Sequence, residues 1–193
     1  RMGMSQGTKL ILQSIFGLVF MLFYLSGTMS PLDAERIKLL QGLEGITATD
    51  YKFWLQVPFI KEPVLDMGWL YVPFGMFVIL AISNSVNFAD GVDGLAIVPA
   101  SLTAGVYALF AYIIGNSIYS RTLLFTHVVG SGELSIILAA LVGAGLGFLW
   151  FNAFPAQVFM GDTGSLALGG ILGVVAIMLK QEFLFLIAGG IFV

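Results

Sequence analysis

Cysteine is absent from the chain, which excludes a disulfide framework and a thiol nucleophile. Charge is also scarce, because Asp, Glu, Lys and Arg make up only 10% of the 193 residues, against about 25% in soluble domains. The net charge of −3 gives no case for binding nucleic acid. In place of charge the chain is 59% hydrophobic, with a mean hydropathy of +1.00. Together these features indicate a polytopic membrane protein.

The apolar residues fall into runs that predict an all-α fold, a transmembrane helix bundle with about five to six spans. Five runs are complete and cover residues 10–25, 67–82, 95–114, 134–151 and 166–179. A sixth run, 183–193, is too short to cross a bilayer. We therefore expect a single integral membrane domain over residues 1–193. Because the chain starts at Arg1 and stops within an apolar run, we also expect it to be a fragment of a larger protein.

Two short connections, residues 83–94 and 152–164, are predicted to lie on the same side of the membrane. Two spans separate them, so the chain crosses twice and returns to the side it left. Lys9 precedes two further crossings and falls on that side too. The loop charges do not decide which side this is, because acids outnumber bases in the long 26–66 segment. The topology thus predicts a site built from these connections and the segment around Lys9.

The first connection contains a row of polar residues spaced three apart: Asn84, Asn87, Asp90 and Asp93. On a helix, residues with this spacing share one face, with Cβ atoms about 5–6 Å apart. Two amides and two carboxylates on one stripe can hold a polar ligand or a hydrated cation. The alternative is an ordinary interfacial turn, since Asp-Gly is a common turn dipeptide.

The second connection holds a lone acid, Asp162, between long apolar runs. A carboxylate costs roughly 2.5–3.5 kcal/mol at the bilayer centre and less at the interface, so its presence calls for a reason. Pro155 predicts that the preceding helix ends nearby, and Thr163 or Ser165 can cap the next helix. A helix start suits phosphate, and a carboxylate suits Mg²⁺. Helix capping by Asp162 itself is the alternative, and Phe159 could either stack on a planar base or contact lipid.

Other features favour structural roles. The G-x-x-x-G pattern predicts close helix packing at Gly143 with Gly147 and at Gly169 with Gly173. Lys180 and Glu182 are expected to anchor the end of a span at the membrane interface.

Residues 84–94 read Asn-x-x-Asn-x-x-Asp-Gly-x-Asp-Gly, and residues 155–170 read Pro-Ala-Gln-Val-Phe-Met-Gly-Asp-Thr-Gly-Ser-Leu-Ala-Leu-Gly-Gly. These runs closely resemble the phospho-N-acetylmuramoyl-pentapeptide transferase family, within the polyprenyl-phosphate N-acetylhexosamine-1-phosphate transferase superfamily. The resemblance covers essentially the whole chain. It corresponds to the central part of a family with about ten spans.

The resemblance implies an Mg²⁺-dependent glycosyl-phosphate transferase. Such an enzyme moves phospho-N-acetylmuramoyl-pentapeptide from UDP-MurNAc-pentapeptide to undecaprenyl phosphate, and its products are lipid I and UMP. This is the first membrane step of peptidoglycan synthesis, and so it serves cell wall biogenesis, cell shape and cell division. The resemblance also implies a multi-pass protein in the lipid bilayer of the bacterial inner membrane, with its active site facing the cytoplasm. A homodimer is compatible with it.

By motif position, the resemblance implies that Asp162 is a catalytic residue and the Mg²⁺ ligand. The residues implied to line the nucleoside pocket are Asp90, Gly91, Val92, Asp93 and Phe159, with Phe159 near the uracil. The residues implied to bind substrate as polar supports of the site are Asn84, Asn87 and Asn152, and Lys9 resembles a family lysine just before a span. The family's upstream aspartate pair and downstream histidine loop have no counterpart in the chain. We therefore expect these 193 residues alone to be inactive.

Two other functions stay open. A membrane transporter also has acids in broken helices, but near the midplane of the bilayer, whereas these acids lie at span ends. The second open function is that of a related polyprenyl-phosphate hexosamine-1-phosphate transferase that uses another sugar.

Overall fold

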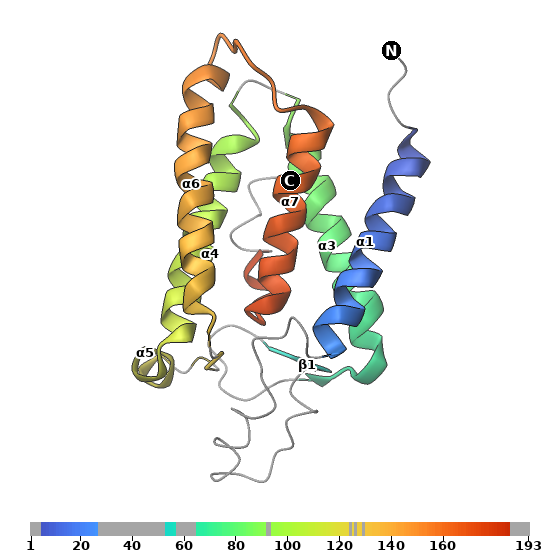
Figure 1. The fold of residues 1–193 in the computed structure, drawn as a ribbon, viewed down its shortest axis with the longest axis vertical. Helices are drawn as coiled ribbons and strands as arrows, with labels where there is room; N and C mark the ends of the chain where they lie inside the picture. The colour runs from blue at the N-terminus through green and yellow to red at the C-terminus, as the bar shows by residue number, and fades with distance from the viewer. Residues whose placement is uncertain are drawn as a thin grey trace.

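The computed structural model describes residues 5–26, 53–56, 65–91, 94–123, 125, 127–128 and 130–185. Within these ranges, five helices are long and apolar enough to cross a membrane, which confirms the all-α polytopic bundle (Figure 1). They are α1 (Gln6–Ser26), α3 (Tyr71–Ala89), α4 (Ile97–Gly115), α6 (Gly132–Asn152) and α7 (Gly161–Met178). The shorter elements are β1 (Trp54–Leu55), β2 (Leu65–Asp66), the 3₁₀ turn η2 (Gly68–Leu70) and α5 (Ser117–Thr122). β1 and β2 form an antiparallel pair.

The long helices alternate in direction, so each end of the bundle gathers a fixed set of helix ends. Figure 1 shows α1, α4 and α7 beginning at the upper end, where α3 and α6 finish. We call this end the site end, and the opposite end, where α5 and β1 lie, the far end. α7 packs against α3 and α4, while α1 packs on α3 and α6 on α4. α7 therefore sits between two helix pairs.

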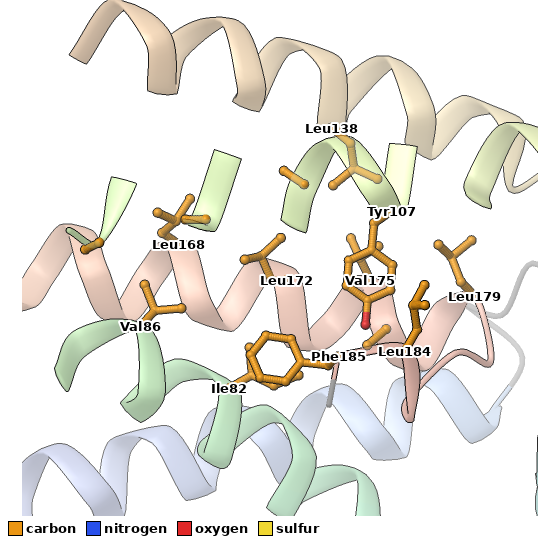
Figure 2. Close-up of a cluster of buried hydrophobic side chains, with 14 of the residues drawn as sticks. Ile82, Val86, Tyr107, Leu138, Leu168, Leu172, Val175, Leu179, Leu184 and Phe185 are labelled. Atoms are coloured by element: carbon orange, nitrogen blue, oxygen red, sulfur yellow. The ribbon is translucent and has the colours of Figure 1, made fainter. Parts of the chain in front are cut away.

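The main core lies where α7 meets its neighbours. Leu168, Leu172 and Val175 of α7 belong to one buried cluster with Ile82 and Val86 of α3 (Figure 2). On the other side the same cluster includes Tyr107 of α4 and Leu138 of α6. Much of the remaining apolar surface is exposed, as expected for helices that face lipid. This core thus holds α7 against α3 on one side and against α4 and α6 on the other.

Two helix boundaries differ most from the predicted spans. α3 continues to Ala89, seven residues beyond the predicted end at 82, and α7 begins at Gly161 rather than 166. The sequence prediction stopped at the first polar residues, but Ser83, on α3, donates a hydrogen bond to the Leu166 carbonyl at 2.8 Å. Because such groups find partners inside the bundle, the helices extend through them. The sixth predicted run lies outside the described residues beyond Phe185.

The two G-x-x-x-G pairs have different surroundings. A Cβ on Gly169 would lie 2.6 Å from the Ser83 Cα, and one on Gly173 would lie 3.0 Å from the Ile79 Cα. This pair therefore permits close packing of α7 on α3, as predicted. Among the described residues, a Cβ on Gly143 or Gly147 would meet no atom within 4 Å, so within this part of the chain the close packing predicted for that pair is wrong.

The far end contains a buried polar cluster that the sequence prediction placed at the membrane interface. Lys180 is fully buried and Glu182 is 4% exposed, so neither is a surface anchor. The Lys180 Nζ atom lies 3.8 Å from the Tyr71 ring centroid and donates to the Trp54 carbonyl at 3.4 Å. The Tyr71 hydroxyl donates a hydrogen bond to Glu182. We call Tyr24, Trp54, Tyr71, Lys180 and Glu182 the far-end cluster.

Candidate functional site

Lys9 and Asp162 meet at the site end. The Lys9 ammonium forms an ion pair with the Asp162 carboxylate and donates a hydrogen bond to it, joining α1 to α7 across 153 residues of sequence. Counting the crossings predicted a shared side but not this direct contact. The Asp162 side chain is 57% exposed and that of Lys9 is 19% exposed. The carboxylate is thus open to solvent on one side while the ammonium is more sheltered.

Asp162 occupies the first turn of α7, whose N-terminal cap is Met160. The predicted side-chain caps are wrong, because no side chain caps this helix and Ser165 lies a full turn inside it. The unpaired N–H groups and partial positive charge of a helix start favour anions nearby. A carboxylate at this position is therefore stabilised, and so is a phosphate group brought close to it.

Asp90 approaches the same helix start from the C-terminal cap of α3. Its carboxylate lies near the Gly161 N–H and the Ser165 side chain. Partial burial raises the pKa of Asp90 above its ordinary value, and the negative charge of Asp162 raises it further, while the polar groups of Gly161 and Ser165 oppose the shift. Two carboxylates thus lie near one helix start.

Two asparagines of the predicted polar row tie α3 to its neighbours. The Ser165 hydroxyl donates to the Asn87 Oδ1 atom at 2.7 Å, which links α7 to α3. The Asn84 amide donates to the Gln13 Oε1 atom at 3.0 Å, which links α3 to α1. These side chains support the helices that present Lys9 and Asp162.

Asn152 fixes the segment that leads into α7. At the end of α6 its Oδ1 atom accepts a hydrogen bond from the Gly94 N–H at 3.0 Å. Its amide nitrogen donates to the Val158 carbonyl at 2.8 Å. Asn152 is only 4% exposed, so both bonds are shielded from water. One side chain thus connects the turn before α4 with the 153–160 segment.

The structure describes three of the five residues predicted to line the nucleoside pocket, Asp90, Gly91 and Phe159. Phe159 is 63% exposed on the 153–160 segment, so its ring is free to contact a ligand or lipid. Gly91 is exposed in the turn after Asp90. Val92 and Asp93 lie outside the described residues.

The site end fits a divalent cation that is shared with a ligand. Among the described residues, no group of three or more acids or histidines converges to form a complete protein cage. Mg²⁺ is usually held by one or two carboxylates together with waters and substrate phosphates. Exposed Asp162, with Asp90 near the same helix start, supplies a partial oxygen set of this kind.

Sequence reasoning missed Ser165 and Gln13 as partners of the polar row. Ser165 is fully buried and bonds to both Asn87 and the Gly161 carbonyl. A buried serine one turn after Asp162 could have been found by extending α7 backward from the apolar run, which places Ser165 on its α3-facing side. Gln13, one helical turn after Lys9, follows from the same spacing.

An apolar groove of about 600 Å³ runs along the bundle, from Leu166 near the site end to Leu134 and Met178 near the far end. Its lining includes Leu12 and Phe16 of α1, Ser83 of α3, and Leu166 and Gly170 of α7. Leu12 follows Lys9 by three residues and Leu166 follows Asp162 by four, so the groove extends from the ion pair along the helices. A long apolar chain with a charged head fits such a surface.

Comparison with known proteins places the chain in a family. The model of glycosyl transferase family 4 matches residues 1–180. The phospho-N-acetylmuramoyl-pentapeptide-transferase of Granulibacter bethesdensis is 46% identical over 191 residues, which cover 99% of this chain and 48% of that protein. The proteins of the same name from Desulfovibrio desulfuricans and Rickettsia montanensis are each 55% identical, over 75% and 72% of this chain and 40% and 38% of their own lengths.

The chain spans less than half the length of these curated relatives. The matched family model includes both predicted motifs, the α1 segment with Lys9 and most of the bundle that holds them together. The chain therefore belongs to glycosyl transferase family 4.

Proposed function

We propose that the protein transfers phospho-N-acetylmuramoyl-pentapeptide from UDP-MurNAc-pentapeptide to undecaprenyl phosphate, releasing UMP and forming lipid I. The observation that carries this proposal is the meeting of Lys9, Asp90 and Asp162 at one end of a membrane bundle. The names of the relatives supply the substrate class. We further propose that this end faces the cytoplasm of a bacterium, where a nucleotide sugar is made.

In the proposed reaction, an oxygen of the lipid phosphate attacks the β-phosphorus of the UDP-sugar. The bond between that phosphorus and the bridging oxygen breaks, and the electron pair leaves with UMP. Catalysis of phosphoryl transfer is mainly positioning and neutralisation of charge. Mg²⁺, held by Asp162 and by phosphate oxygens, would neutralise part of that charge.

The chain's own residues hold the reactants in this scheme. The first turn of α7 presents N–H groups to a phosphate, and the Lys9 ammonium lies within reach of the same place. Phe159 offers an exposed ring for the uracil. The apolar groove beside Lys9 and Asp162 would take the polyprenyl tail. Asn84, Asn87 and Asn152 keep these parts in register through their contacts with protein groups.

Replacing Asp162 by Asn in the intact protein tests the proposal. We expect UMP release from UDP-MurNAc-pentapeptide to fall by about a hundredfold or more, the size of effect seen when one electrostatic group is removed from an active site. Glu133→Gln is the matched control, because Glu133 also lies in the first turn of a helix, but at the far end. Near-normal turnover by Asp162→Asn would rule out the assigned role.

The same assay separates this function from the alternatives. A donor such as UDP-N-acetylglucosamine should give little UMP, whereas efficient turnover of that donor would favour a related transferase with another sugar. A transporter would release no UMP from either donor. The position of Asp90 and Asp162 at helix ends, rather than within a span, supports surface chemistry.

A further inference from the structure

We propose that Lys9 is a built-in competitor of the divalent cation at Asp162, so that binding the metal requires the ammonium to leave the carboxylate. The proposal rests on the proposed function, because it takes Asp162 as the metal ligand. It adds a second role for Lys9, namely to control when that ligand is available.

The first observation is the ion pair itself. The Lys9 Nζ atom contacts the Asp162 Oδ2 atom, so an oxygen that a cation would need is already engaged by a positive group. The first turn of α7 adds further partial positive charge beside the same carboxylate. With the ammonium in place, the negative charge of Asp162 is matched locally and little is left to attract a metal.

The second observation is the electrostatic cost of keeping both cations. Two positive charges about 4 Å apart repel each other even in a high-dielectric surface environment, and more strongly in a partly buried one. Asp162 is 57% exposed, so a hydrated ion can approach it from solvent, while Lys9 is 19% exposed and stays close to the protein. The incoming metal and the Lys9 ammonium therefore compete for this carboxylate: a cation on Oδ2 takes the place of the ammonium, and a cation on Oδ1 is repelled by it.

Third, the Lys9 side chain is long enough to move away from the Asp162 carboxylate. Lysine has a flexible four-carbon stem with rotatable donors, so its head can swing without any shift of α1. Lys9 lies in the first turn of α1, and α1 begins at the site end (Figure 1). Once displaced, the ammonium remains near the start of α7 and is available to a phosphate as a point charge. Metal binding would thus free Lys9 for the substrate at the moment when both are needed.

Binding of Mn²⁺ to the intact protein, followed by the electron paramagnetic resonance signal of free Mn²⁺, tests the proposal without any turnover. Lys9→Met keeps most of the stem but removes the charge, and we expect it to bind Mn²⁺ about two- to fivefold more tightly, as the loss of one exposed pair allows. Lys9→Arg keeps the charge and should bind Mn²⁺ about as weakly as the wild type. Arg121→Met removes one positive charge at the far end and is the control for net charge; it should leave the affinity unchanged.

The outcomes are distinguishable. Unchanged or weaker Mn²⁺ binding by Lys9→Met overturns the competition, even if Asp162→Asn abolishes binding and so supports the proposed function. Mn²⁺ binding that survives in Lys9→Met combined with Asp162→Asn overturns both, because the metal then lies elsewhere. The gain in Lys9→Met should also shrink as salt is raised, because screening weakens the competing ion pair.

Discussion

At the scale of single residues, the site end includes polar side chains that bind other protein groups. Asn152 shows this most clearly, because its two amide atoms bind the Gly94 N–H and the Val158 carbonyl while only 4% of the residue is exposed. Such a residue does not need to touch the substrate to matter. It sets where the 153–160 segment, and therefore Phe159, lies.

We expect Asn152→Ala to loosen that segment. The substitution removes the hydrogen bonds to the Gly94 N–H and the Val158 carbonyl, and each lost bond costs about 0.5–1.5 kcal/mol. Hydrogen–deuterium exchange should become faster over residues 153–160 and around Gly94. Asn116→Ala is the control, since Asn116 also makes two hydrogen bonds to backbone groups, accepting both through its Oδ1 atom, but at the start of α5. Equal protection of 153–160 in wild type and Asn152→Ala would contradict the assigned role.

A second residue-scale prediction concerns pH. Because the folded state raises the pKa of Asp90 above its unfolded value, the folded state binds the proton more tightly, and ionised Asp90 costs stability at neutral pH. Asp90→Asn should therefore unfold at a higher temperature than wild type at pH 7. The difference should narrow as the pH is lowered toward the carboxyl range, where the wild type takes up the proton. A thermal unfolding series over pH measures this, and a difference that widens at low pH would show the sign to be wrong.

At the scale of elements, the contact between α3 and α7 decides whether the site forms. Gly169 and Gly173 bring the two backbones close together, and the same interface places Ser165 beside Asn87 and the α7 start beside Asp90. A wider separation of these helices would break the polar contacts even with every side chain present. The two glycines therefore act on the site through the geometry of the helix pair.

Gly169→Ala and Gly170→Ala form a matched test of this contact. A Cβ on Gly169 would lie 2.6 Å from the Ser83 Cα and 2.9 Å from the Ile82 carbonyl oxygen, and backbone atoms cannot move aside easily. A Cβ on Gly170 would meet nothing within 4 Å. We expect Gly169→Ala to destabilise by about 1–3 kcal/mol and Gly170→Ala to be neutral. Unfolding followed by tryptophan fluorescence compares them, and equal stability would argue against close packing.

At the scale of the whole molecule, α1, α3 and α7 are tied by polar groups at both ends of the bundle. The site end is open and holds the Lys9–Asp162 pair, whereas the far-end cluster is buried. At the far end, Glu182 receives the Tyr71 hydroxyl, and desolvation by burial raises the pKa of Glu182 above its ordinary value. We infer that the buried end gives the bundle its rigidity while the open end is left accessible.

Tyr71→Phe and Tyr24→Phe test the far end with the same chemical change. Tyr71 donates to Glu182, so its loss leaves a buried acid poorly satisfied and should cost about 1–3 kcal/mol. The Tyr24 hydroxyl is equally buried but has no hydrogen-bond partner among the described residues, so its removal should be nearly neutral. Thermal unfolding in lipid nanodiscs measures both. A larger loss for Tyr24→Phe would contradict this account of the cluster.

The sequence predicted much of the fold because lipid imposes a simple rule: a span must be long, apolar and helical. It predicted that Lys9 and the connection containing Asp162 share a side, since crossings can be counted. It could not predict the direct ion pair, which depends on the packing of α1, α3 and α7. The exposed position expected for Lys180 was wrong, because hydropathy does not reveal that aromatic rings and a backbone carbonyl can enclose an ammonium.

The separation of Lys9 and Asp162 along the chain has a consequence for biosynthesis. α1 leaves the ribosome long before α7, and membrane proteins are made from the N-terminus onward. Until the fifth helix inserts, Lys9 has no Asp162 to pair with, and Asp90 lacks both Gly161 and Ser165. The site is therefore not built up gradually with each helix. Its charges come together only when α7 packs between the α1–α3 pair and the α4–α6 pair. A chain that ended before α7 would therefore lack the Lys9–Asp162 pair.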